Sequence, residues 1–235
     1  MTKIRNNKME HMEEDMPADS QLSFIAKVLS VFTHEIKNHL AIIKESNGLI
    51  GDLITLGQTA PNAAQCLKII ESVEHQITKT SLLCTNLNRL GHRMDMSVST
   101  FNLNECLEEL LSLIQRTANQ KKLSFKKDFA QNIPSLYNSP SKLQFLIFCL
   151  LEKSMDLLDY GGKIIIKTAY TNGSVSISII PKGDFKETNA DSVCYDKSVL
   201  HMIINKMGGD ISCQTGDETT VITLPVFLNS GQQDE

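Results

Sequence analysis

Two long stretches of helical periodicity near the start of the chain constrain its fold more than any other feature. In the first, apolar residues recur at steps of three and four and so form one stripe of a helix that runs from about residue 20 to 55. The members of this stripe are Leu22, Ile25, Leu29, Phe32, Ile36, Leu40 and Ile43. Gly57 and Pro61 then predict a turn.

The second stretch has the same spacing, and we expect Gly91 to end its helix. Its apolar positions are Cys66, Ile70, Val73, Ile77, Thr80, Cys84 and Leu87. Two antiparallel helices joined by a short turn cannot hide both stripes from water by themselves. We therefore expect a homodimer, in which a second copy of residues 20–95 completes a four-helix bundle.

His34 stands on the polar side of the first helix. At about 100° per residue it lies roughly 200° from both Phe32 and Ile36, so the buried stripe leaves the imidazole in solvent. Asn38 lies one turn further on and shares this face. A neutral imidazole is available near physiological pH and can act as a nucleophile, which makes His34 the candidate reactive residue.

A zinc site is the alternative that this stretch suggests. His34, Glu35 and His39 look superficially like a metalloprotease signature, but that motif needs histidines at i and i+4. His34 and His39 are five residues apart, roughly 140° around the helix, and cannot share one ion. We expect no metal site, and we expect His39 to flank the bundle core.

The rest of the chain predicts a compact α/β sandwich, a sheet with helices on one face, so that the whole chain is of the α+β class. Two helices are expected to begin at about residues 103 and 143. A third is expected over 199–207, and Gly208-Gly209 ends it. Strands are expected over 121–129, 163–169, 175–180, 210–213 and 219–225, and Asn172-Gly173 is a type I′ hairpin turn. The expected division is a disordered or frayed lead (1–19), the helical hairpin (20–95), the sandwich (96–228) and a tail (229–235).

Composition narrows the classes of function. A net charge of −4 over 235 residues argues against nucleic acid as the main partner, since phosphate binding needs concentrated Lys and Arg. Six cysteines without a CxxC pair predict buried, reduced thiols. No apolar run reaches the roughly 18 residues of a membrane span, so we expect a cytoplasmic protein.

These features together resemble the transmitter region of bacterial sensor histidine kinases, over roughly residues 22–226. The segment Thr33-His-Glu-Ile-Lys-Asn-His-Leu40 resembles the H-box, and the order of helices, strands and Gly-Gly turns behind it resembles the ATP-binding domain of the Bergerat type. The resemblance implies that His34 accepts a phosphoryl group and that Glu35 accepts the ring proton or orients the ring. It also implies that Asn38 positions a water or a phosphoryl oxygen, and Lys37 could offset phosphate charge.

The nucleotide-binding half departs from the family pattern. Cys149 and Lys153 stand where the family places the asparagines that hold magnesium and phosphates. The segment from Pro181 keeps only Gly183 of the Asp-x-Gly-x-Gly box that binds adenine. The segment 193–199, expected to cover the phosphates, has no glycine. We therefore expect the fold to be kept and ATP binding to be lost, as in dimeric histidine phosphotransferases.

The leading hypothesis is a phosphorelay protein that passes a phosphoryl group between His34 and the aspartate of a response-regulator receiver domain. No cofactor is expected on this chain, and the receiver would supply Mg²⁺. Two alternatives stay open: an active ATP-dependent histidine kinase with a separate sensor, and a non-phosphorylated adaptor or phosphatase that docks a receiver.

Overall fold

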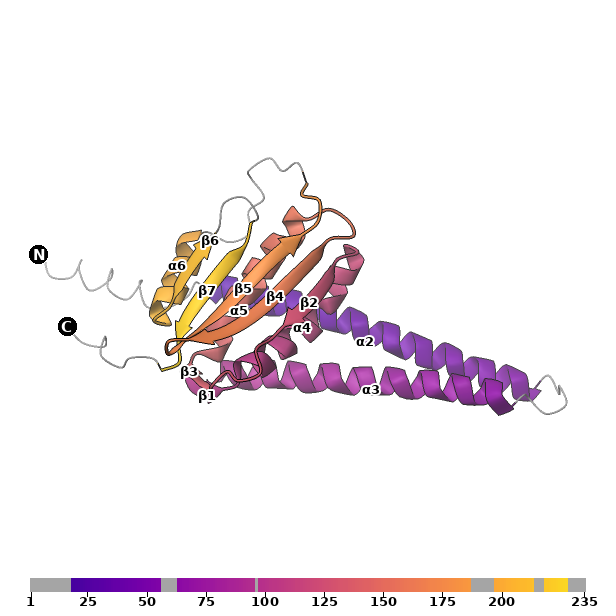
Figure 1. The fold of residues 1–235 in the computed structure, drawn as a ribbon. Coiled ribbons are helices and arrows are strands. Elements are labelled where there is room, and N and C mark those ends of the chain that lie inside the picture. The colour runs from indigo at the N-terminus through magenta and orange to yellow at the C-terminus, as the bar shows by residue number, and fades with distance from the viewer. Residues whose placement is uncertain (1–17, 56–62, 96, 187–196, 214–217, 228–235) are drawn as a thin grey trace, which may run out of the picture.

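The computed structural model describes residues 18–55, 63–95, 97–186, 197–213 and 218–227. Helix α2 (Ala18–Thr55) and helix α3 (Ala63–Met94) run side by side as a long arm, and the remaining elements gather at one end of it (Figure 1). Both predicted helices are confirmed. Residues 1–17 of the predicted lead, the turn at Gly57 and the tail lie outside the described residues, whereas Ala18 and Asp19 of the predicted lead already belong to α2.

The predicted end of the second helix at Gly91 is wrong, because α3 continues to Met94. No heavy atom lies within 4 Å of the place that a Cβ of Gly91 would occupy, and His92 and Arg93 stand in the last turn. Cationic side chains there interact favourably with the negative end of the helix dipole. A single glycine without a neighbouring stop signal is tolerated inside a long helix at a cost of about 1 kcal/mol.

The predicted apolar stripe of α2 is only partly buried, because the helix has two apolar faces. Phe24, Val28 and His39 are buried against the rest of the chain. By contrast, Leu22, Leu29 and Leu40 are 67%, 44% and 54% exposed. Counted at about 100° per residue, these two faces point roughly 120° apart, and the sequence pattern merges them into one stripe.

The second part of the chain is an α/β domain, as predicted. Its elements in chain order are β1 (Ser99–Phe101), α4 (Leu103–Gln120), β2 (Ser124–Asp128), β3 (Leu136–Asn138), α5 (Pro140–Leu157), β4 (Lys163–Thr171), β5 (Ser174–Lys182), α6 (Lys197–Lys206), β6 (Asp210–Cys213) and β7 (Thr220–Pro225). The larger sheet has the order β2-β4-β5-β7-β6, in which only β2 and β4 pair in parallel. The short strands β1 and β3 pair separately, and at three residues each they show no readable alternation.

Local sequence signals explain several boundaries in this domain. The Asn102 side chain accepts a hydrogen bond from the Glu105 amide and so caps α4. Asn172 and Gly173 both have positive φ, 52° and 79°, as the type I′ turn between β4 and β5 requires. Gly208 has φ +70° behind α6, which confirms the Gly-Gly helix stop.

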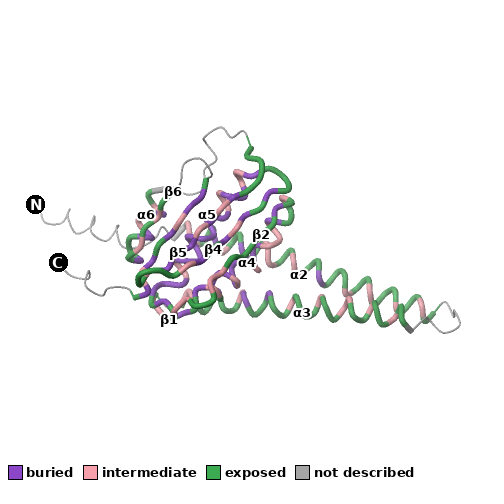
Figure 2. Tube along the Cα trace, in the orientation of Figure 1, coloured by how far each residue is buried: buried purple, intermediate pink, exposed green. Residues whose placement is uncertain are grey.

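Helices α4 and α5 lie between the sheet and the arm, and buried residues concentrate there (Figures 1 and 2). One continuous core therefore joins the α/β domain to the base of α2 and α3. Phe24 of α2 inserts against two rings of α5, with centroids 5.8 Å from Phe145 and 4.8 Å from Phe148. The α/β domain is docked on the arm by apolar packing as well as by charge.

None of the helices in the described part of the chain is long and apolar enough to cross a membrane.

Candidate functional site

His34, Lys37 and Asn38 share one exposed strip of α2. Their spacing of three and four residues places them on the same side of the helix, away from both of its apolar faces. Within the described part of the chain, His34 makes no hydrogen bond or ion pair. The imidazole is thus presented to solvent on a helix that is anchored elsewhere, as the sequence predicts.

Glu35 has partners other than His34. Its Oε2 accepts a hydrogen bond from Nη1 of Arg116 in α4 at 2.7 Å, and its Oε1 lies 3.4 Å from Nε2 of His39. Both carboxylate oxygens thus face residues on the buried side of α2. Arg116 holds the carboxylate on this side, about 100° around the helix from His34, and the role of Glu35 towards the ring stays a prediction.

His39 is buried, with 5% of its surface exposed, rather than flanking the core as predicted. Its Nδ1 lies 3.0 Å from the Thr80 hydroxyl of α3. That hydroxyl donates its own proton to the Gln76 carbonyl at 2.8 Å, so it accepts from His39 and Nδ1 carries a proton. Nε2 then donates to Glu35 only when the ring carries a second proton.

Arg116 is the residue of this site that sequence reasoning missed. It lies 81 positions from Glu35, and no local motif marks it. One clue is available. Arg116 lies on the polar side of the strongly amphipathic helix α4, and its long side chain can reach a neighbouring element from there. Nothing in the sequence states which element that is.

Cys149 and Lys153 lie one turn apart on α5, the helix that would hold the nucleotide in the family pattern. Cys149 is 1% exposed. The ammonium of Lys153 lies 3.9 Å from the carboxylate of Glu218, ahead of β7. Neither side chain offers an amide or carboxylate oxygen, which is the kind of ligand that Mg²⁺ prefers.

Pro181 and Gly183 have roles in the sheet. Pro181 is a buried residue of β5 that stands opposite Ile164. Gly183 has φ +143°, and a Cβ there would lie 2.9 Å from the Cα of Gly162. The one glycine that this box keeps is therefore required by backbone packing, with or without a nucleotide. Most of the segment 193–199 lies outside the described residues.

The five described cysteines are free thiols, but not all of them are buried as predicted. Cys106 and Cys149 are buried, whereas Cys84 and Cys213 are exposed, and none of the five described cysteines forms a disulfide. Burial raises the pKa of the Cys106 thiol to about 12. Across the described ranges, no three or more His, Cys, Asp or Glu side chains gather as a metal-binding group.

Comparisons with known proteins bear on this arrangement. No family model matches the chain. Adaptive-response sensory kinase SasA of Microcystis aeruginosa is 23% identical over 172 residues, which cover 69% of this chain and 44% of that protein. Cell-division control histidine kinase PdhS of Brucella anthropi is 25% identical over 91 residues, which cover 38% of this chain and 9% of that protein.

A solved structure, the catalytic domain of histidine kinase ThkA, has the fold of the α/β domain. It superposes with a TM-score of 0.50 at 18% identity and covers 56% of this chain and 97% of that domain. This chain spans less than half of the length of the two curated relatives above.

The fold of the chain and the proteins similar to it point to the same class of protein. The chain combines a long helical N-terminal region with an ATPase-like α/β domain, and both its sequence relatives and its structural neighbour are histidine kinases. The predicted resemblance to a histidine-kinase transmitter region and the predicted α+β fold class are thereby confirmed.

Proposed function

We propose that this protein is a histidine phosphotransferase of two-component signalling, in which a phosphoryl group passes between His34 and an aspartate of a receiver domain. The observation that carries the proposal is the exposed His34 on a helix whose other two faces are apolar. In-line phosphoryl transfer depends on positioning and charge compensation, and so a sparse site suffices.

The neighbours of His34 supply what such a transfer needs. Asn38, one turn away, can donate a hydrogen bond to a phosphoryl oxygen or hold a water. The ammonium of Lys37 can offset the phosphoryl charge. The acyl-phosphate partner brings its own Mg²⁺, so no metal is required from this chain.

We further infer that ATP binding is lost, so that the phosphoryl group reaches His34 from another protein. Support comes from the chemistry of the four residues at the family's nucleotide positions. Cys149 is buried, Lys153 pairs with Glu218, Pro181 belongs to the sheet, and Gly183 packs on a neighbouring glycine. In the family pattern an active kinase would need oxygen ligands for Mg²⁺ at the positions that Cys149 and Lys153 occupy.

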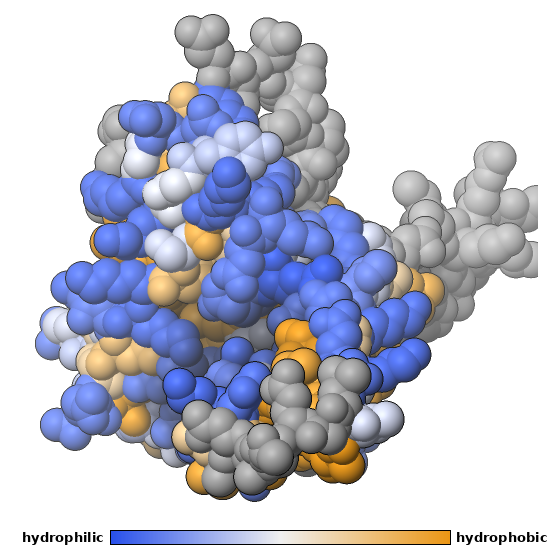
Figure 3. Space-filling model, turned by 90° about the vertical axis from the view of Figure 1, so that its right-hand side faces the viewer, coloured by the Kyte–Doolittle hydropathy of each residue, from blue (hydrophilic) through white to orange (hydrophobic). Residues whose placement is uncertain are grey.

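The apolar surface of the arm supports a homodimer through residues 20–95. Ten large apolar residues are exposed along it: Leu22, Leu29, Leu40, Ile42, Leu49, Ile54, Leu67, Ile70, Ile77 and Leu82. Figure 3 shows apolar surface over the arm at the lower edge of a largely hydrophilic face. An open depression of about 550 Å³ with mostly apolar walls adds to it, between Phe32 of α2 and Cys84 of α3. We place this dimer in the cytoplasm, with a receiver domain and not nucleic acid as its partner.

Two donors distinguish the candidate functions. The protein is incubated with radiolabelled ATP, and separately with a phosphorylated receiver domain, with His34→Ala as the inactive variant and His75→Ala as a matched control on the exposed surface of α3. Label from the receiver that His34→Ala alone abolishes supports the proposal. Label from ATP shows a kinase, and loss of receiver phosphate without label on the protein shows a phosphatase.

The dimer is tested by light scattering after size-exclusion chromatography. Leu40→Glu places a charge on the exposed apolar face and is expected to give a monomer, because burying an unpaired carboxylate is costly. Glu45→Lys, also exposed but about 140° around the helix from Leu40, is the control and is expected to leave the mass of a dimer. A wild-type protein with the mass of a monomer at all concentrations refutes the dimer.

A further inference from the structure

A chain of polar contacts connects the α/β domain to the residue beside His34. It runs from Arg116 in α4 to Glu35 and His39 in α2 and ends at Thr80 in α3. The arginine and the carboxylate are partly buried, with 20% and 29% of their side chains exposed. A charge-assisted bond in such a setting is stronger than a surface ion pair.

The contact between Arg116 and Glu35 is a single-point one. Only Nη1 of the guanidinium reaches the carboxylate, and Nε of Arg116 is buried with no hydrogen-bond partner within the described structure. A buried donor without a partner costs about 1–3 kcal/mol. Opening the contact lets water reach Nε and offsets part of what the lost bond contributes, so the contact is suited to open and close.

The docked arrangement keeps the carboxylate of Glu35 away from His34. On the helix, Glu35 falls on the side of Val28 and His39 that faces the α/β domain, about 100° from His34. The Glu35 carboxylate can turn towards the imidazole only after it leaves Arg116.

We propose that Arg116 is a positioning residue that holds Glu35 away from His34 while the α/β domain is docked, so that phosphoryl transfer to His34 accelerates when this contact opens. The inference rests on the proposed function of His34. It assigns to the α/β domain a restraint on the reactive residue that requires no nucleotide.

The chemistry of the step shows why the carboxylate matters. A ring nitrogen of neutral His34 uses its lone pair to form the new N–P bond. The bond from phosphorus to the donor breaks at the same time, a P–O bond in the acyl phosphate of a receiver and a P–N bond in phosphoramidate, and its electron pair stays on the departing group. The ring is then a cation with a proton on its other nitrogen. A free Glu35 carboxylate accepts or shares this proton, which is the role of a general base.

The test measures the initial rate of His34 phosphorylation with two donors, the small molecule phosphoramidate and a phosphorylated receiver domain. Arg116→Gln removes the charge that holds Glu35, and Arg116→Lys restores a cation. The matched control is Lys27→Gln, which breaks another ion pair between α2 and the α/β domain, to Glu152 at 2.8 Å, without contacting Glu35. Far-ultraviolet circular dichroism checks that each variant is folded.

We expect Arg116→Gln to raise the rate about threefold or more, a small part of what a positioned general base contributes. Arg116→Lys and Lys27→Gln should remain near the wild-type rate. In a Glu35→Gln background, Arg116→Gln should have no effect, because the group that it releases is gone. A purely structural role of Arg116 does not produce this dependence on Glu35.

The proposal is overturned if Arg116→Gln lowers the rate, if Lys27→Gln raises it equally, or if the gain persists in the Glu35→Gln background. No labelling of His34 by either donor in any variant also overturns it, since the freed carboxylate then activates nothing. The expected pattern with phosphoramidate but no transfer from receivers keeps the role of Arg116 and refutes the proposed phosphotransferase.

Discussion

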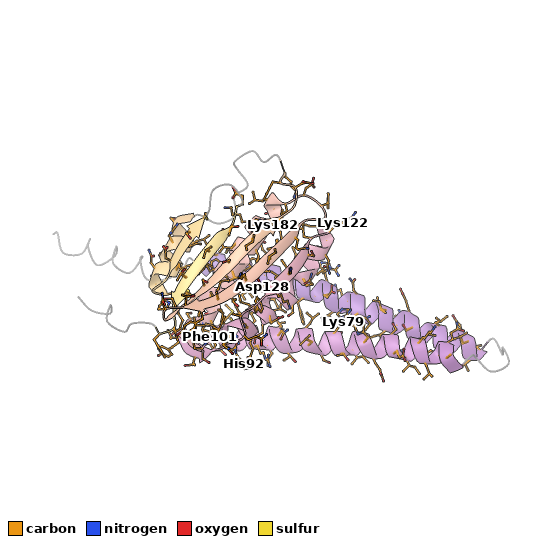
Figure 4. All side chains as sticks on the ribbon, in the orientation of Figure 1. Lys79, His92, Phe101, Lys122, Asp128 and Lys182 are labelled. Carbon is orange, nitrogen blue, oxygen red and sulfur yellow. The ribbon has the colours of Figure 1, made fainter. Side chains whose placement is uncertain are left out.

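Replacing Glu109 by glutamine should destabilise the protein more than any other single exchange of an acid for its amide in α4. Glu109 is 2% exposed, and its carboxylate receives two hydrogen bonds from Arg93 at 2.7 and 3.0 Å, with Arg89 at 3.6 Å. Arg93 also lies over the ring of Phe101, 5.8 Å from its centroid. In Figure 4, His92 and Phe101 mark this junction between the arm and the α/β domain.

The magnitude follows from the burial of the pair. The hydrogen bond to Glu109 raises the pKa of Arg93 and outweighs the lowering by burial. A guanidinium remains charged at neutral pH, so the cation persists when its partner is neutralised. Removing one member of a buried ion pair costs about 3–5 kcal/mol. Because 17% of the Arg93 side chain remains exposed, we take the lower end, about 3 kcal/mol. For a chain of this size, that lowers Tm by about 6–12 °C.

Urea unfolding followed by circular dichroism measures this change. Glu108→Gln is the matched control, because the neighbouring Glu108 pairs with Lys127 at the surface, where such a pair contributes at most about 1 kcal/mol. The double variant Arg93→Met with Glu109→Leu should recover most of the loss, since an apolar replacement of both partners removes the buried charge. Equal losses for Glu109→Gln and Glu108→Gln would refute the reasoning.

Two further predictions concern stability. Gly209→Ala should lower the free energy of unfolding by about 1–3 kcal/mol, because the new Cβ would lie 2.4 Å from the Thr223 carbonyl oxygen. Gly48→Ala has open space for its Cβ and should raise the free energy of unfolding by up to about 1 kcal/mol. Thermal melts that rank the two variants the other way contradict this. The raised pKa of Cys106 favours the protonated thiol in the folded state. The stability that this thiol contributes is therefore fully present below the ordinary thiol pKa of 9.0 and is lost as the pH rises towards about 12. The destabilisation caused by Cys106→Ala should therefore shrink by about 1 kcal/mol between pH 9 and 10, as measured by urea unfolding at each pH, and a constant difference would contradict this.

Elements whose signal is periodic and local could be predicted from the sequence. Both long helices, the turn at Asn172-Gly173 and the glycine stop behind α6 follow from spacing and turn chemistry within a few residues. Strands β1 and β3 could not, because three residues carry no period. The end of α3 was missed because Gly91 has no neighbour that forces a stop.

In the candidate site, too, only the features with a local sequence signal could be predicted. The exposure of His34 follows from the geometry of its own helix, and the structure agrees. The partners of Glu35 and His39 cannot be predicted in this way, because Arg116 and Thr80 come from other helices and reach them only through tertiary packing. A motif fixes which residue types are adjacent in sequence, whereas the direction of a flexible carboxylate depends on the cations that the fold brings near it.

The geometry of α2 explains why one helix can serve three purposes. At about 100° per residue, the face of Val28 and His39, the face of Leu29 and Leu40, and the face of His34 lie roughly 120° from one another. The first packs on the α/β domain, and the second is exposed and is the face that we propose packs on a second copy. Glu35 belongs by angle to the first face, although in sequence it is the neighbour of His34. A movement of the α/β domain that separates Arg116 from α2 therefore changes the surroundings of Glu35 directly, whereas His34 has no contact with Arg116 to lose. The proposed restraint on the site thus depends on how the two domains dock.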